Sequence, residues 1–201
     1  MTNSPSTKMQ WKFCEDFNVK LQNAMPISKL FETENYKPYW LSEDEAKKFY
    51  TMPLKDITIV APDEEKAGVK YAPYYINVDS GENPSFTVRR FLFLDMPLET
   101  LWWNNVGNGR LFCALMQFYD YGDTLGNGQW LPQKPMEVMI TNHQDGSGEV
   151  MFIDGNDPTN RSSHKFSGMD VSDLYMDVPE WGEWQTLIKD FKDRSARKAK
   201  S

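Results

Sequence analysis

The sequence predicts an α+β or mainly β protein: an antiparallel sheet or small sandwich of about seven strands with a C-terminal amphipathic helix. Short apolar runs alternate with turns rich in glycine, proline, asparagine and aspartate. Few segments have the helical periodicity that crossovers between parallel strands require. The stretch 86–121 concentrates apolar and aromatic side chains, and it predicts central strands around which the rest of the chain folds.

A chain of 201 residues fits one domain, with a core large enough to need no disulfide or metal. Its composition is globular, since 40% of the residues are hydrophobic and 14% are aromatic. We predict a disordered lead over 1–8, a single globular domain over 9–192 and a basic tail over 193–201. No apolar run reaches the length of a membrane helix, and the N-terminus does not have the pattern of a secretion signal.

The first predicted strand covers residues 9–21, where apolar and polar side chains alternate, with a turn expected at Glu15–Asp16. A helix over the same residues is the weaker alternative. Residues 23–41 contain two prolines and predict a loop. Ser42 and Glu45 have the spacing of a capping box, which predicts a short helix that ends near Tyr50.

Two further strands are predicted over 55–61 and 69–78, joined by a polar turn. Pro73 lies inside the second of them and cannot donate a ladder hydrogen bond, so we expect that strand at an edge or with a bulge.

The central stretch predicts a strand over 86–95, a short helix over 96–104 and a strand over 110–121. Helical spacing places Leu98, Leu101 and Trp102 on one apolar stripe and leaves Trp103 off it.

The last third predicts a hairpin with strands over 136–141 and 149–154, followed by a polar loop over 154–170. A helix is predicted over 180–198, because its apolar side chains share one face and its cations cluster at the C-terminal end.

The two cysteines, Cys14 and Cys113, lie in apolar segments. This predicts reduced core thiols in a cytoplasmic protein; a disulfide between them is the alternative.

The net charge of −7 is unevenly distributed. Between Glu137 and Trp184 there are ten acidic and two basic residues, a local charge of −8, whereas the last ten residues carry +4. Arg89 and Arg90 lie among aromatic residues, a pattern that can bind single-stranded nucleic acid. The acidic body opposes such binding and favours a basic partner.

We therefore hypothesise a non-enzymatic binding or inhibitory protein that docks on a basic protein, such as a nucleic-acid-handling enzyme, by mimicking nucleic acid. The hypothesis involves no cofactor, no metal and no membrane. Exposed aromatic side chains would anchor the partner and carboxylates would attract it. The candidate partner-binding residues are Trp103, Trp130, Asp145, Asp154, Asp157, Asp170 and Asp173.

The alternative is a small hydrolase or phosphodiesterase that uses His143 or His164 with a nearby Asp145 or Asp170, with or without a divalent metal. The loop 154–160 offers oxygen ligands for a cation, but its spacing is not that of an EF-hand and equally fits a solvated turn. No nucleophile motif accompanies the histidines, so the sequence favours the binding class.

Overall fold

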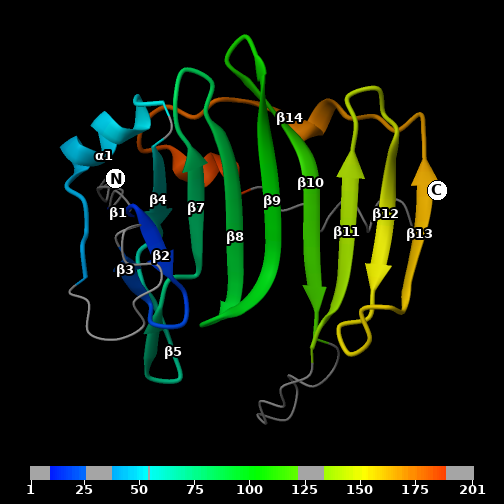
Figure 1. Ribbon diagram of the computed structural model, residues 1–201, viewed down its shortest axis with the longest axis horizontal. Helices are drawn as coiled ribbons and strands as arrows, with labels where there is room; N and C mark the ends of the chain where they lie inside the picture. The colour runs from blue at the N-terminus through cyan, green and yellow to red at the C-terminus, as the bar shows by residue number, and fades with distance from the viewer. Residues whose placement is uncertain (1–9, 26–37, 54, 122–133, 189–201) are drawn as a thin grey trace, which may run out of the picture.

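The computed structural model describes residues 10–25, 38–53, 55–121 and 134–188. Its main feature is one ten-stranded antiparallel sheet, whose strands lie side by side in the order β1-β4-β7-β8-β9-β10-β11-β12-β13 (Figure 1), with β14 paired to β10. These strands are β1 Lys12–Cys14, β4 Asp56–Val60, β7 Tyr74–Asp79, β8 Ser85–Phe93, β9 Met96–Gly107, β10 Arg110–Asp120, β11 Met136–Asn142, β12 Gly148–Ile153, β13 Arg161–Phe166 and β14 Tyr175–Asp177.

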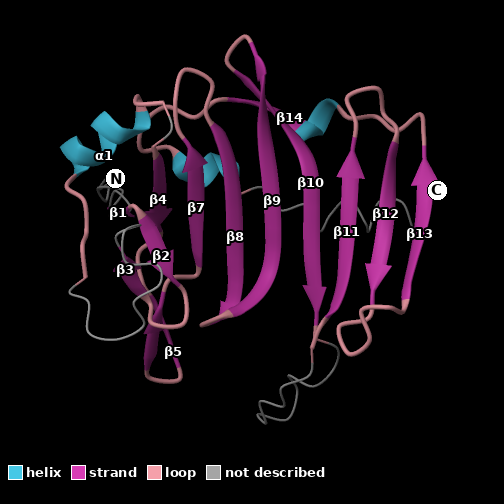
Figure 2. Cartoon of the chain, in the orientation of Figure 1, coloured by secondary structure: helices cyan, strands magenta, loops and turns pink. Residues whose placement is uncertain are grey.

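Two small ribbons complete the strands: β2 Asp16–Asn18 with β3 Asn23–Met25, and β5 Glu64–Lys66 with β6 Val69–Tyr71. Helical structure among the described residues is short (Figure 2): α1 Glu43–Tyr50 and two 3₁₀ turns, η3 Ser172–Leu174 and η4 Trp184–Leu187. The molecule is therefore mostly β and contains a large antiparallel sheet, one of the two predicted arrangements, whereas a seven-stranded sandwich is not confirmed.

The larger hydrophobic core lies on one side of the sheet, which we call the core face. Alternate residues of the strands supply it, and α1 and η4 pack against them. Trp184 and Leu187 of η4 are fully buried, and the Leu187 carbonyl accepts a hydrogen bond of 3.2 Å from Trp103 Nε1. The strand residues buried here include Ile57, Ile59, Ile76, Val78, Phe86, Val88, Leu101 and Trp103.

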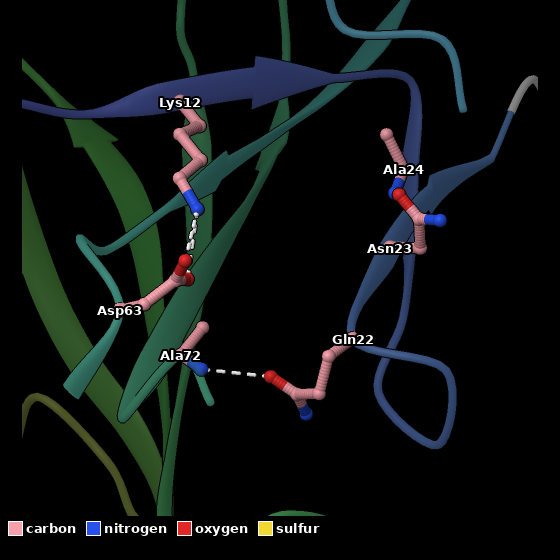
Figure 3. Close-up of polar contacts among 6 residues, drawn as sticks. All are labelled: Lys12, Gln22, Asn23, Ala24, Asp63 and Ala72. Atoms are coloured by element: carbon pink, nitrogen blue, oxygen red, sulfur yellow. Dashed lines mark hydrogen bonds and ion pairs between the residues drawn. The ribbon is translucent and has the colours of Figure 1, made fainter. Parts of the chain in front are cut away.

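The opposite side, which we call the open face, is covered at one end by the β2–β3 ribbon, in front of the sheet in Figure 1. A second, smaller core forms there from Cys14, Phe17, Ala24, Val60, Ala72 and Tyr75. Two polar contacts join residues near the N-terminus to the segment between β4 and β7 (Figure 3). Gln22 Oε1 accepts a hydrogen bond of 2.7 Å from the Ala72 backbone, and Lys12 Nζ lies 2.7 Å from the Asp63 carboxylate.

Residues 96–104 are part of strand β9, so the predicted helix there is wrong. Strand β9 lies between β8 and β10 and forms ladder hydrogen bonds with both of these long strands. Tertiary pairing thus overrides a local helical spacing of only nine residues. The residues of the predicted polar loop 154–170 likewise include a strand, β13, which pairs with β12.

The C-terminal helix predicted over 180–198 is not confirmed. Its described part contains only the η4 turn, and residues 189–198 lie outside the part of the chain that the structure describes. The predicted strand over 69–78 is divided at Pro73 into β6 and β7, and β7 is an interior strand, not an edge. The Pro73 carbonyl accepts a hydrogen bond of 2.8 Å from Phe91, so this residue still joins the sheet.

Several predictions are confirmed. Helix α1 begins after Ser42, and Ser42 and Glu45 form the predicted capping box. The chain bends at Glu15 between β1 and β2, and β11 and β12 form the predicted hairpin. In the described part of the chain, no helix has both the length and the apolar character needed to cross a membrane. The predicted lead and basic tail lie outside the described residues.

Candidate binding groove

An open groove of about 780 Å³ lies on the open face, over β4, β7, β8 and β9. Antiparallel register builds its floor as rows of residues that run across the strands. One row is Thr58, Asn77, Thr87 and Trp102, each paired with the next. The row beside it begins with Asp56, Asp79 and Ser85. The side chains of these two rows are polar except for the large aromatic side chain of Trp102.

Four carboxylates border this groove. Asp56 and Asp79 are direct cross-strand partners at the ends of β4 and β7, and Glu15 and Asp16 come from the bend between β1 and β2. The Thr58 hydroxyl lies 3.4 Å from the Glu15 carbonyl, a contact that holds this bend against the sheet. None of the described residues that line the groove is lysine, arginine or histidine.

The ionised form of the Asp56 carboxyl is electrostatically disfavoured. Burial raises its pKa, and repulsion from Asp79 raises that pKa further. Like charges directly opposite each other on an antiparallel pair destabilise a sheet. The groove consequently carries an electrostatic cost that a cationic ligand would reduce.

Trp102 is the aromatic residue of the groove. Its ring is partly exposed, whereas its neighbour Trp103 is completely buried. Asn104 and Thr87 lie beside it and offer amide and hydroxyl groups. An indole face beside carboxylates can bind a cationic side chain by cation–π and ionic interactions together.

A basic side chain lies on this face one row beyond the groove. Arg89 is paired across the ladder with Tyr75, donates a 2.8 Å hydrogen bond to the Tyr75 hydroxyl and lies over its ring. That row also meets the β2–β3 ribbon, where Phe17 contacts Tyr75. The acidic groove thus ends at a more basic and aromatic row.

The acidic residues predicted from the sequence to bind a partner do not form one surface. Asp145 lies in the β11–β12 turn, next to the segment that carries Asp170 and Asp173, as the Met169–Gly146 backbone bond shows. Asp154 and Asp157 lie in the β12–β13 loop at the other end of β12. A strand of six residues at about 3.3 Å each separates the two groups by roughly 20 Å.

Most of these aspartates organise turns. In each case a carboxylate oxygen accepts the backbone N–H two residues later, at 2.8 to 3.1 Å. At Asp145 and Asp157 the Ser147 and Thr159 hydroxyls donate as well, and these hydroxyl bonds, together with the backbone bonds, lower the pKa of both carboxyls. This geometry is the Asx turn, so the cluster of acidic residues in the sequence has a local structural cause. The four residues are Asp145, Asp154, Asp157 and Asp170.

Of the two predicted aromatic anchors, the structure places only Trp103. Trp103 belongs to the core and has no exposed surface, so it cannot contact a partner in the folded protein. Trp130 lies outside the residues that the structure describes. The sequence signal that identifies Trp102 instead is simple alternation, because adjacent strand residues face opposite sides of the sheet.

The histidines of the alternative hydrolase lie in different elements. His143 is exposed in the β11–β12 turn, and it adds to the lowering of the Asp145 pKa that the Ser147 hydrogen bonds mainly cause. His164 is exposed in β13, and its ring contacts Phe152. Neither histidine lines the groove. Across the residues with described positions, no three His, Cys, Asp or Glu side chains are arranged to hold a metal ion.

Comparisons of this chain with protein-family models, curated proteins and solved structures give no match. Its function is therefore argued from its own sheet and groove.

Proposed function

We propose that this chain is a non-enzymatic binding protein whose open face docks on a basic protein partner, such as a nucleic-acid-handling enzyme. The observation that supports this most is the groove, which combines four carboxylates with the partly exposed Trp102 and has no basic residue in its described lining. The proposed binding surface is acidic and aromatic, as inferred from the sequence, but it lies on β4, β7, β8 and β9 and not in the 137–184 region.

The physical argument is that a cation in the groove relieves a cost already present. The paired carboxylates of Asp56 and Asp79 repel each other in the unbound protein. An arginine or lysine of the partner would separate and neutralise them, and its side chain could stack on Trp102. Net charge of −7 on the whole chain would also speed the encounter with a basic surface.

The experiment measures binding of a synthetic arginine-rich peptide by fluorescence anisotropy at low and physiological salt. The test variant is Asp56→Asn with Asp79→Asn. The control is Glu64→Gln with Glu65→Gln, two exposed acids of strand β5 that give the same change in net charge. We expect the groove variant to weaken binding about tenfold or more, and the control to weaken it much less.

Trp102→Ala provides the second arm. It should increase the dissociation rate, because it removes the aromatic surface without changing any charge. Equal loss of binding in the groove and control variants would mean that only net charge matters, and it would overturn the proposal. The hydrolase alternative makes a different forecast: a phosphodiester or ester substrate would be cleaved, and His143→Ala or His164→Ala would abolish the cleavage.

A further inference from the structure

Strands β11 and β12 have the sequence of strands that are covered on both faces. Val138, Met139 and Ile140 are consecutive in β11, and residues 150–153 of β12 are all apolar. A sheet with one face in solvent normally alternates apolar and polar residues instead. The pattern therefore predicts that more than the described chain covers this end of the sheet.

The core-face side of these strands is partly exposed. We define the β11–β12 patch as the apolar residues there together with Phe118 of the adjoining strand β10: Phe118, Met136, Val138, Ile140, Val150 and Phe152. Phe152 pairs with Val138, and Met136 lies two residues along the same strand face. Met136 and Phe152 are 44% and 36% exposed, whereas Phe118 and Ile140 pack against the main core. The core thus continues into a surface of side chains that are open to solvent.

The rim of this patch carries charges of both signs. A hollow of about 390 Å³ is lined by Met136 and Phe152 together with Lys134, Asp120 and Asp154. A two-fold axis places the same surface on both partners, so an apolar centre meets itself and a lysine can meet a carboxylate of the other copy. A patch with both charges at its rim is complementary to itself, unlike the uniformly acidic groove.

We propose that the β11–β12 patch binds a second copy of this chain, which gives a symmetric dimer. The two sheets would pack face to face at about 10 Å, the usual separation of stacked sheets. The groove lies on the other side of the sheet and over other strands, so each dimer presents two grooves. This inference is independent of the proposed function and has a separate test.

The test is the molar mass by sedimentation equilibrium over a range of micromolar concentrations. We expect the native chain to rise from 23.4 kDa towards twice that mass. Phe152→Lys and, separately, Met136→Lys should lower the association constant about tenfold or more, because each buries an ammonium group in the apolar centre. Lysine makes the net charge less negative, so weaker association cannot result from greater overall repulsion.

The matched control is Val69→Lys, which makes the same change at a residue of similar exposure, 40%, on the β5–β6 ribbon. It should leave the mass unchanged. Circular dichroism and melting curves verify that each variant is folded, and Met136→Lys serves if Phe152→Lys fails to fold. A native chain that stays monomeric would overturn the dimer. Association that neither patch variant alters would place the contact elsewhere, for example at the edge of β13, and would equally overturn this interface.

Discussion

Trp102 and Trp103 are adjacent in the chain but lie on opposite faces of β9. Trp103 pairs with Phe86 across the core face and donates a hydrogen bond to Leu187, while Trp102 pairs with Thr87 in the groove. Helical spacing assigned the two residues the other way round. Side chains repeat every 3.6 residues in a helix and every 2 in a strand, so the two structures bury different members of a pair of neighbours. Because a helix was predicted over 96–104, the buried and the partly exposed tryptophan were exchanged.

The first prediction compares these two tryptophans. Trp103→Ala should lower the free energy of unfolding by about 3–5 kcal/mol, because it leaves a cavity in the core and removes a buried hydrogen bond. Trp102→Ala should cost clearly less, since its ring is already partly in water. Urea denaturation followed by circular dichroism measures both values. Equal costs for the two variants would contradict the assigned faces.

The second prediction concerns Asp56, whose pKa is raised by burial and by Asp79. A carboxyl with a raised folded-state pKa favours the folded protein when it is protonated. That contribution is present below the ordinary pKa and is lost as the pH rises through the raised value. Asp56→Asn should therefore raise the melting temperature at neutral pH, and the gain should shrink as the pH falls through this range.

Asp63→Asn is the comparison for this measurement, because Asp63 forms an ion pair with Lys12. It should leave the melting temperature unchanged or slightly lower. If Asp63→Asn raised the melting temperature at neutral pH as much as Asp56→Asn, the stabilisation would come from the change in net charge and not from the Asp56–Asp79 pair.

At the scale of elements, several acidic loop residues have a structural role in turns. The β11–β12 turn is held by Asp145, which accepts hydrogen bonds from both the backbone and the hydroxyl of Ser147. Gly146 has a φ of +79°, and a Cβ there would lie 2.4 Å from the Met169 carbonyl oxygen. This turn therefore needs a side-chain acceptor at one position and glycine at the next.

The third prediction separates the charge of Asp145 from its acceptor oxygen. Asp145→Asn keeps an oxygen for Ser147 and should change stability little, whereas Asp145→Ala should destabilise the hairpin. Thermal melts compare the two variants, and backbone amide exchange in β11 and β12 localises the effect. If the two variants behave alike, the hydrogen bonds to Ser147 contribute little.

The C-terminal segment shows how an apolar spacing is satisfied without a regular helix. Trp184 and Leu187 are buried as a helix would bury them, yet the described backbone makes only one 3₁₀ turn. Side chains three residues apart lie on the same side of an α-helix and of a 3₁₀-helix, so this spacing is compatible with either helix. Trp184 and Leu187 are thus buried as the apolar spacing predicted, whereas the described backbone that carries them is a 3₁₀ turn and not the predicted helix.

At the scale of the whole molecule, the sheet separates two cores. Cys14 belongs to the smaller core on the open face and Cys113 to the larger one on the core face, and both are buried thiols outside any disulfide. Burial raises the pKa of Cys14, with a smaller contribution from Asp16 and Glu15. The reactive thiolate is therefore suppressed at Cys14 in the folded state.

The fourth prediction follows from this placement. A thiol reagent should label the native protein only as fast as local or global unfolding exposes the cysteines. Urea should expose both cysteines to rapid labelling. Reductant should leave the melting temperature unchanged. Cys14→Ala and Cys113→Ala, each labelled under native conditions and read by mass spectrometry, show whether the two cores open together. A native protein that reacts at the rate of a free peptide would contradict the burial.

The sequence by itself determined the features that arise from nearby residues. These are the mostly β class, the capping box that starts α1, the β11–β12 hairpin, the bend at Glu15 and the burial of both cysteines. Each depends on alternation, turn residues or local hydrogen bonds, which act over a few positions.

Only the tertiary structure decided the features that depend on pairing between distant residues. The strand identity of 96–107 comes from β8 and β10, because hydrogen bonds to both neighbours outweigh a short helical pattern. The groove likewise joins Asp56 to Asp79 and Thr87 to Trp102 through register alone. Register fixes which side chains share a face, and no local spacing encodes it, so the acidic groove could not be found from the order of residues.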